Sequence, residues 1–186
     1  DGKIEKQNPN SMLISNAIAQ GLSVDYIADY FFKLGLENFL IEIGGEVYCF
    51  GLNSRGEDWK IGVDKPIEGS GYENRENQII VNLSGKAIAT SGNYRKFIEN
   101  GNQKYGHSFD PRTGFPAENE LLSVSVVSES CMMCDAWATA FMVCGLEESK
   151  KILRTLENVE AYFIFLDKNG QTQTYMTEGF EDFCEK

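Results

Sequence analysis

Long hydrophobic runs are missing from this chain of 186 residues. No stretch approaches the roughly 20 consecutive apolar residues that a membrane-spanning helix requires. The first residues, Asp1–Lys6, are polar and do not resemble the hydrophobic part of a signal peptide. We therefore expect no membrane span in this sequence, and a protein that is either cytoplasmic or preceded by an upstream segment.

Basic residues are also scarce. The 17 Lys and Arg residues face 28 Asp and Glu residues, which gives a formal net charge of −11. This balance argues against nucleic acid or an anionic membrane surface as the main partner. Hydrophobic residues at 42% and aromatic residues at 12% exclude a disordered chain. The length is sufficient for one domain with a substantial core.

Histidine occurs once, as His107, and the five cysteines are odd in number and scattered. This composition predicts neither a disulfide framework nor a tetrahedral zinc site. Cys131 and Cys134 have the spacing of a redox motif, but no thioredoxin-like βαβ pattern surrounds them. We expect buried thiols, or thiols at the start of a helix. His107 can act as a general acid or base near neutral pH, or it can be a structural or surface histidine.

Periodicity and turn residues predict an α+β fold with mainly antiparallel sheets and packed helices. There is no internal repeat and no low-complexity tract. Gly44-Gly45 predicts a tight hairpin turn, and Gly35 predicts the end of the first helix. The predicted helices are 22–34, 133–143 and 149–156, and the predicted strands are 39–43, 46–50, 59–63, 79–83, 87–90, 122–128, 162–166 and 171–176.

The segment 91–120 is predicted to be a long loop, and loops of that length in compact domains are often functional. Thr90-Ser91-Gly92 lies at the end of a predicted strand, where small donors and a glycine allow an anion to approach the backbone. Asp110–Gly114 has the composition of a turn. Each of these matches is common when taken alone.

Asp135 and Thr139 are four residues apart on a predicted helix, so both side chains point to the same side. A carboxylate and a hydroxyl with backbone carbonyls nearby suit a hard cation such as Mg²⁺. Alternatively, Asp135 helps to start the helix and Thr139 only packs against its neighbours. The spacing alone is compatible with either reading.

Six segments in order resemble the motifs of the ApbE family, the FAD:protein FMN transferases. The family patterns are I-A-K-G-x-x-x-D, G-G-[DE], W-x-[IV]-G-[IV]-x-x-P, T-S-G-[DN]-Y-[RE], H-[IS]-x-D-P-[RK]-T-G-x-P and D-A-x-[AS]-T-A. They correspond here to 18–25, 44–46, 59–66, 90–95, 107–116 and 135–140. Six ordered matches are far more specific than any one of them.

The resemblance implies a T-fold-like architecture and a Mg²⁺-dependent transfer of FMN from FAD to a Thr or Ser hydroxyl of an acceptor protein, with release of AMP. It implies metal ligation by Asp135, Thr139 and the carbonyl of Ala19. It assigns to His107 a contact with the flavin end of FAD and acceptance of the hydroxyl proton. The other residues it places at the cofactor are Gln20, Gly44, Gly45, Glu46, Thr90, Ser91 and Gly92.

Two departures from the family pattern affect these expectations. Gln20 stands where the family usually has lysine, which removes a positive charge and predicts weaker or more Mg²⁺-dependent binding of FAD. The family's N-terminal part is also missing, so we expect 1–16 to be an irregular lead-in and 17–186 to be an N-terminally truncated flavin transferase domain. The resemblance further implies a periplasmic protein or a membrane-anchored lipoprotein.

Two other functions are compatible with the sequence. The chain could be an FAD-binding module or an FAD pyrophosphatase, because hydrolysis needs only water in place of the acceptor hydroxyl. It could also be an interaction domain that uses its acidic surface. The presence of His107, Asp135 and Thr139 argues against the interaction domain.

Overall fold

The computed structural model of the chain describes residues 3–67, 76–93, 97–100, 103–106 and 109–185. Its helices and strands alternate irregularly along the sequence. The helices are α1 (Ala19–Lys33), α2 (Cys131–Cys144), α3 (Leu146–Leu153) and α4 (Glu178–Glu181). The strands are β1 (Phe39–Ile43), β2 (Glu46–Phe50), β3 (Trp59–Asp64), β4 (Asn77–Leu83), β5 (Lys86–Gly92), β6 (Phe97–Asn100), β7 (Gln103–Gly106), β8 (Leu121–Ser128), β9 (Glu160–Leu166) and β10 (Thr172–Met176).

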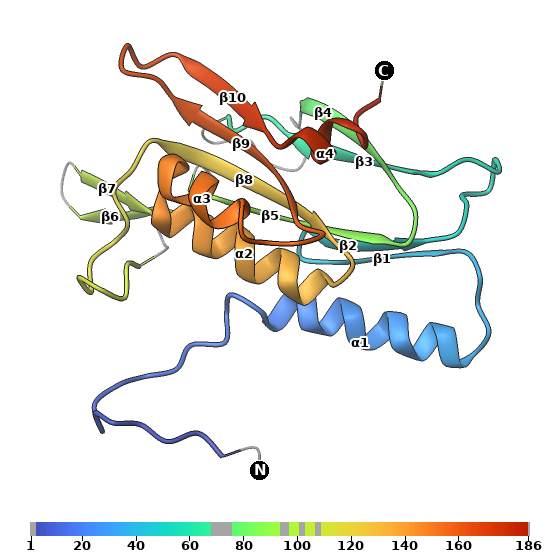
Figure 1. Ribbon diagram of the computed structural model, residues 1–186, viewed down its shortest axis with the longest axis horizontal. Helices are drawn as coiled ribbons and strands as arrows, with labels where there is room; N and C mark the ends of the chain where they lie inside the picture. The colour runs from blue at the N-terminus through green and yellow to red at the C-terminus, as the bar shows by residue number, and fades with distance from the viewer. Residues whose placement is uncertain (1–2, 68–75, 94–96, 101–102, 107–108, 186) are drawn as a thin grey trace.

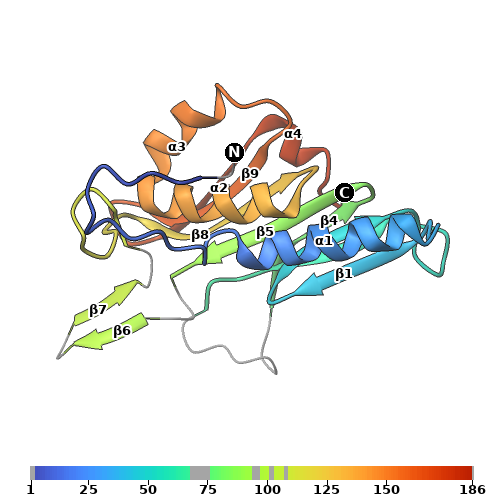
Figure 2. The same cartoon turned by 90° about the horizontal axis from the view of Figure 1, so that it is seen from below.

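The centre of the fold is an antiparallel sheet with the strand order β1-β2-β5-β8-β9-β10. Helices α1, α2 and α3 lie on one face of this sheet, and the β3–β4 hairpin with α4 lies on the other (Figure 1). Figure 2 shows α1 and α2 side by side in front of the strands. The predicted α+β fold with antiparallel sheets is confirmed.

Successive side chains of the central strands point to opposite faces of the sheet and pack in two separate hydrophobic cores. On β5, Ala87 and Ala89 pack in the core beneath the helices, whereas Ile88 packs in the core beneath β3 and β4. Val126 and Val127 of β8 divide in the same way. Because both faces of β8 are covered, its residues are almost continuously buried and do not alternate between buried and exposed.

The first helix forms as predicted, and its buried face consists of small residues. The residues buried in α1 are Gly21, Val24 and Ala28, whereas the larger side chains of Tyr26 and Tyr30 are exposed. Small side chains on the buried face allow the α1 backbone to come close to α2. The spacing of large apolar residues therefore identifies the helix, but it does not show which face of the helix packs against α2.

The hairpin turn at Gly44-Gly45 is confirmed. Ile43 pairs with Glu46, and the two glycines between them have φ angles of +69° and +112°. Both values lie where side chains other than glycine are disfavoured. The turn therefore accounts for both glycines without any cofactor.

Two features of the fold differ from the prediction. The segment 91–120 is not one long loop, because β5 continues to Gly92 and the short hairpin of β6 and β7 follows. Helix α4 was not predicted, since four residues are too few for a periodic pattern. Residues 3–15 form neither helix nor strand. None of the helices in the described ranges has the length and hydrophobicity to cross a bilayer.

Candidate functional site

Asp135 is a nearly buried carboxylate on α2, with 4% of its surface exposed. Its Oδ2 accepts a hydrogen bond of 3.1 Å from the backbone N–H of Gly21 on α1. Burial raises the pKa of the carboxyl, and the Gly21 N–H partly offsets that rise. Among the described residues no basic side chain forms an ion pair with it, so ionised Asp135 is destabilised unless a cation binds.

Thr139 lies one turn along α2 from Asp135, on the same side of the helix. Its Oγ1 is 3.2 Å from the Oγ of Ser91, which comes from β5. Thr90 belongs to the opposite face of the sheet, where its hydroxyl lies 2.7 Å from the Oγ of Ser125. The structure thus brings Ser91 to the predicted metal ligands and directs Thr90 away from them.

Ala19 is the first residue of α1, two residues before Gly21. Its carbonyl oxygen accepts a hydrogen bond of 2.7 Å from the Oγ of Ser23. The predicted donors, with Asp135 and Thr139, are a carbonyl, a carboxylate and a hydroxyl. These hard oxygen donors fit Mg²⁺, which is often held by one or two carboxylates together with substrate phosphates.

The proposed donor set contains only one carboxylate. Within the described ranges no group of three or more His, Cys, Asp or Glu side chains could hold a metal ion. This result disfavours a site built entirely from charged or imidazole ligands. It leaves open a site in which the protein supplies few ligands and a bound nucleotide supplies others.

Gln20, Gly44 and Glu46 converge beside the start of α1. A Cβ atom built on Gly44 would lie 1.8 Å from Nε2 of Gln20 and 3.4 Å from Oε2 of Glu46. The Gln20 side chain therefore occupies the space that the missing Gly44 side chain leaves. Nothing lies within 4 Å of the corresponding position on Gly45, which is exposed.

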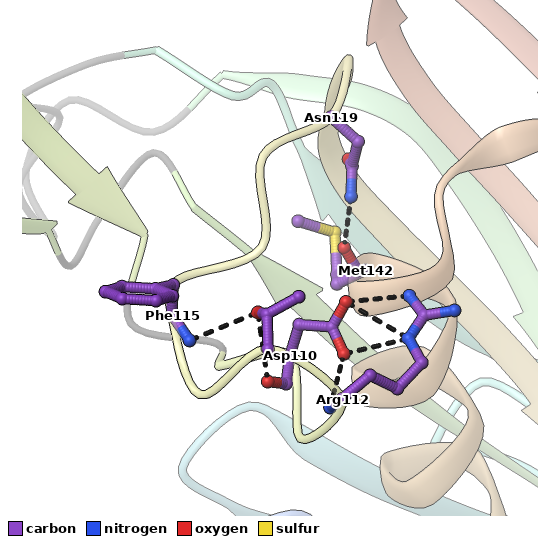
Figure 3. A network of polar contacts seen from close by, with 6 residues as sticks. Asp110, Arg112, Phe115, Asn119 and Met142 are labelled. Atoms are coloured by element: carbon purple, nitrogen blue, oxygen red, sulfur yellow. Dashed lines mark hydrogen bonds and ion pairs between the residues drawn. The ribbon is translucent and has the colours of Figure 1, made fainter.

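His107, the predicted proton acceptor, lies outside the described residues. Three residues further on, the predicted turn is present and is held by Asp110 and Arg112 (Figure 3). The Arg112 Nε and Nη2 atoms donate to the Asp110 carboxylate at 2.8 to 3.1 Å. This guanidinium lowers the pKa of Asp110. These contacts hold the turn in its shape.

A cavity of about 480 Å³ lies between this loop and the end of α2. Its lining includes Asp110, Arg112, Phe115 and Cys144, and none of the predicted metal or cofactor residues. The volume is large enough for part of a ligand, but its lining is not the proposed site. Asn119 closes one side by donating from Nδ2 to the Met142 carbonyl at 2.8 Å (Figure 3).

The structure gives no support for a redox role of the cysteines. All five are free thiols, so the prediction of no disulfide framework is confirmed. Cys131 and Cys134 are fully buried in the first turn of α2. Burial raises the pKa of both thiols, that of Cys134 to about 12. Their spacing thus reflects helix packing and not a reactive pair.

Two residues of the first motif, Gly21 and Asp25, have structural contacts that sequence reasoning did not assign. Gly21 lies against the backbone of Cys131, where a Cβ atom would come within 2.4 Å of the carbonyl oxygen. Asp25 accepts hydrogen bonds from the start of α2. The signal was the spacing itself, because positions 21 and 25 are one helical turn apart and must face the same neighbour.

Comparison with known proteins agrees with the motifs. The model of the ApbE family matches residues 1–163. The FAD:protein FMN transferase of Vibrio cholerae serotype O1 is 36% identical over 183 residues, which cover 98% of this chain and 53% of that protein. The FAD:protein FMN transferase of Escherichia coli K12 is 31% identical over 183 residues, covering 97% of this chain and 50% of that protein.

A solved structure with the same fold is the flavin transferase ApbE from Vibrio cholerae. It superimposes with a TM-score of 0.75 at 36% sequence identity, over 90% of this chain and 51% of that one. The chain therefore spans about half the length of the curated relatives it matches.

Proposed function

The chain belongs to the ApbE family, and on that premise we propose that it carries the metal site and part of the nucleotide site of an FAD:protein FMN transferase. The substrates would be FAD and an acceptor protein with a Thr or Ser hydroxyl. The products would be the flavinylated acceptor and AMP. The names of the relatives support flavin transfer, and the finer details are part of this proposal.

The proposed reaction is a substitution at the phosphorus of the FMN half of the FAD pyrophosphate. The acceptor hydroxyl oxygen forms a bond to that phosphorus, and the bond from the phosphorus to the bridging oxygen breaks. AMP leaves with the bridging oxygen and its electron pair. The hydroxyl proton passes to a general base, for which the resemblance indicates His107.

Ala19, Asp135 and Thr139 would hold Mg²⁺ through a carbonyl, a carboxylate and a hydroxyl oxygen. Bound there, the ion would neutralise charge that develops on the pyrophosphate as AMP leaves. The Gly21 N–H fixes the orientation of the Asp135 carboxylate through its hydrogen bond to Oδ2. A ligand whose orientation is fixed in advance loses less entropy when the ion binds.

Gln20, Gly44, Gly45, Glu46, Ser91 and Gly92 would contact the nucleotide, whereas the Thr90 hydroxyl lies on the opposite face of the sheet. A glutamine amide at position 20 can donate a hydrogen bond to a phosphate oxygen, but it carries no charge. Neutralisation of the pyrophosphate would therefore depend on the metal ion more than in relatives with lysine at this position.

The observation that supports the proposal most directly is the assembly around Asp135. Three elements far apart in the sequence, α1, α2 and β5, bring Gly21, Asp135, Thr139 and Ser91 together at hydrogen-bonding distances. A buried carboxylate with a raised pKa and no ion pair to a described residue lowers the stability of the fold, and such groups are concentrated at functional sites. A bound cation supplies that function.

The test is a titration of FAD into the purified chain with and without Mg²⁺, followed by flavin fluorescence and by AMP release with a threonine-containing acceptor. We expect Mg²⁺-dependent binding and AMP release, with a large loss of transfer but a small loss of binding in His107→Ala. Absence of FAD binding in both conditions, for this chain and for a full-length relative carrying Gln at the same position, would contradict the proposal.

Hydrolysis of FAD to FMN and AMP is the second candidate. One observation favours it, the neutral Gln20. The same assay separates the two functions, because transfer leaves the flavin covalently bound to the acceptor after denaturation and hydrolysis leaves it free. A periplasmic or lipoprotein location stays a prediction that depends on the family resemblance.

A further inference from the structure

Asp25 caps a helix to which it does not belong. This residue of α1 accepts hydrogen bonds from the Ser130 Oγ at 2.7 Å, the Cys131 N–H at 2.8 Å and the Met132 N–H at 3.0 Å. The N–H groups in the first turn of a helix have no partner within that helix. A carboxylate at this end also interacts favourably with the helix dipole. Asp25 therefore attaches α1 to the start of α2 by three bonds.

A second attachment lies one turn earlier on α1. Gly21 packs directly on the Cys131 backbone, and its N–H donates to Oδ2 of Asp135 at 3.1 Å. Asp135 is in turn one helical turn beyond Cys131 on α2. The two helices are thus connected at two levels, with the cap at one level and the proposed metal ligand at the other.

We propose that Asp25 is a positioning residue for the metal site. The proposal depends on the metal site proposed above, and Asp25 itself contacts neither metal nor substrate. Ala19 is six residues before Asp25 on a continuous helix, about 9 Å along the axis. Because both helices are rigid, the cap at Asp25 determines where the Ala19 carbonyl and the Gly21 N–H lie relative to Asp135 and Thr139.

The main test compares Asp25→Asn with Asp29→Asn in the 186-residue chain. Asp29 is exposed on the same helix, so its substitution makes the same change in charge without touching α2. Asparagine at position 25 keeps the size of the side chain, but it has one acceptor oxygen where the carboxylate had two. Mn²⁺ binding in the presence of FAD is measured by electron paramagnetic resonance, well below the unfolding temperature of each variant.

We expect Asp25→Asn to raise the Mn²⁺ concentration for half-saturation by about 10- to 100-fold, as is usual when a partner of a metal ligand is altered. In the metal-free protein we expect faster amide hydrogen exchange at Gly21 relative to Val126 in the central strand β8. Asp29→Asn should change neither quantity. A cap that only stabilises the fold would lower the unfolding temperature and leave the Mn²⁺ concentration unchanged.

Failure of the metal site and failure of the positioning role give different results. If the unsubstituted chain binds no Mn²⁺ with FAD, the proposed function fails, and the Gly21 exchange rate alone decides whether Asp25 positions the Gly21–Asp135 contact. If Asp25→Asn does not fold, Ser130→Ala removes one of the three bonds and takes its place. Equal Gly21 exchange and equal Mn²⁺ affinity in Asp25→Asn and Asp29→Asn would overturn the proposal.

Discussion

Among the single residues, Asp135 combines a stability cost with a proposed chemical role. Its carboxylate is almost completely buried, it accepts a hydrogen bond from the Gly21 backbone N–H, and its pKa is raised by burial. A protein keeps such a group where a bound cation offsets the cost of burial. On the proposed function, we therefore expect the free energy of unfolding of this chain to depend on pH and on Mg²⁺.

We predict that Asp135→Asn raises the unfolding temperature of the metal-free chain at pH 7 by a few degrees. An uncharged amide avoids the cost of a buried charge and can still accept from Gly21. The variant should also lose Mg²⁺-dependent turnover of FAD and any stabilisation by Mg²⁺. Calorimetry with and without Mg²⁺ measures both effects, and Asp29→Asn is the control for lost surface charge.

The pH dependence has a definite sign. Because the pKa of Asp135 is raised in the folded state, the folded chain binds its proton at a higher pH than the unfolded chain, whose aspartates titrate near pH ~3.9. The stability of the unsubstituted chain relative to Asp135→Asn should therefore fall as the pH rises through this interval. A difference that is constant between pH 4 and 7 would contradict a raised pKa of Asp135 in the folded state.

At the scale of the elements, close contact between α1 and α2 is what assembles the site. Gly21 is essential to that contact, since a Cβ atom there would lie 2.4 Å from the carbonyl oxygen and 2.8 Å from the Cα of the adjacent α2 residues. Both are backbone atoms and cannot rotate away. The two helices would have to separate, and Gly21 and Asp135 would move apart with them.

We predict that Gly21→Ala destabilises the chain by about 1–3 kcal/mol, the usual range for overpacking. Alanine is the better helix former by up to ~1 kcal/mol, so the steric effect must exceed the gain in helix propensity. Denaturant unfolding measures the balance, and Ser23→Ala, exposed on the same helix, is the control. A stability equal to that of the unsubstituted chain would mean that the helices separate at no cost.

The loop of residues 109–116 is a second element whose order depends on named contacts. Arg112 binds the Asp110 carboxylate through its side chain and also through its backbone N–H at 2.8 Å. The pair is at the surface, so its removal should affect the loop more than the whole fold.

We expect Arg112→Met to leave the unfolding temperature nearly unchanged and to speed chymotrypsin cleavage at Phe109 or Phe115 several-fold. The backbone bonds that remain around Asp110 should prevent complete loss of the turn. Limited proteolysis followed by mass spectrometry identifies the sites of cleavage. Arg154→Met, which removes a cation from the exposed end of α3, is the control, and equal cleavage rates in the two variants would contradict the prediction.

Sequence patterns predicted most elements because their signals are local. The Gly44-Gly45 turn, the strands and the helix at Asp135 follow from residues within a few positions of each other. Apolar periodicity does not identify the packing face of α1, because close contact between two helices selects small residues, and the pattern of large apolar residues does not detect them. The side chains of Thr90 and Ser91 point in opposite directions because the strand continues to Gly92, whereas the predicted strand ended at residue 90.

At the scale of the whole molecule, the order of the strands sets the position of the site. Strand β8 pairs with β5, although the β6–β7 hairpin lies between them in the sequence. This pairing places β5 beneath α2, where Ser91 contacts Thr139. Pairing between segments more than thirty residues apart has no local signal in the sequence. Only the family motifs, whose order reflects a shared fold, indicated in advance that these segments act together.

Net charge is the other property of the whole molecule that bears on function. A chain of net charge −11 repels the anionic pyrophosphate of FAD over distances that salt can screen, because the Debye length is about 10 Å at 0.1 M salt. Gln20 supplies no positive charge to oppose that repulsion near the site. We predict that, without Mg²⁺, raising KCl from about 20 to about 200 mM speeds the association of FAD.

Two lysine variants separate local from global charge in this experiment. Gln20→Lys and Gln171→Lys change the net charge equally. Gln20 lies beside the turn between β1 and β2 at one edge of the central sheet, whereas Gln171 lies next to β10 at the other edge. We expect Gln20→Lys to lower the dissociation constant of FAD several-fold and to reduce the salt effect, whereas Gln171→Lys should alter the affinity little. Stopped-flow flavin fluorescence measures the rates of FAD association and dissociation.

Two results would contradict these predictions. Slower association at higher salt in the unsubstituted chain would mean that the local field at the site is attractive despite the net charge. Equal effects of the two variants would place position 20 away from the phosphates.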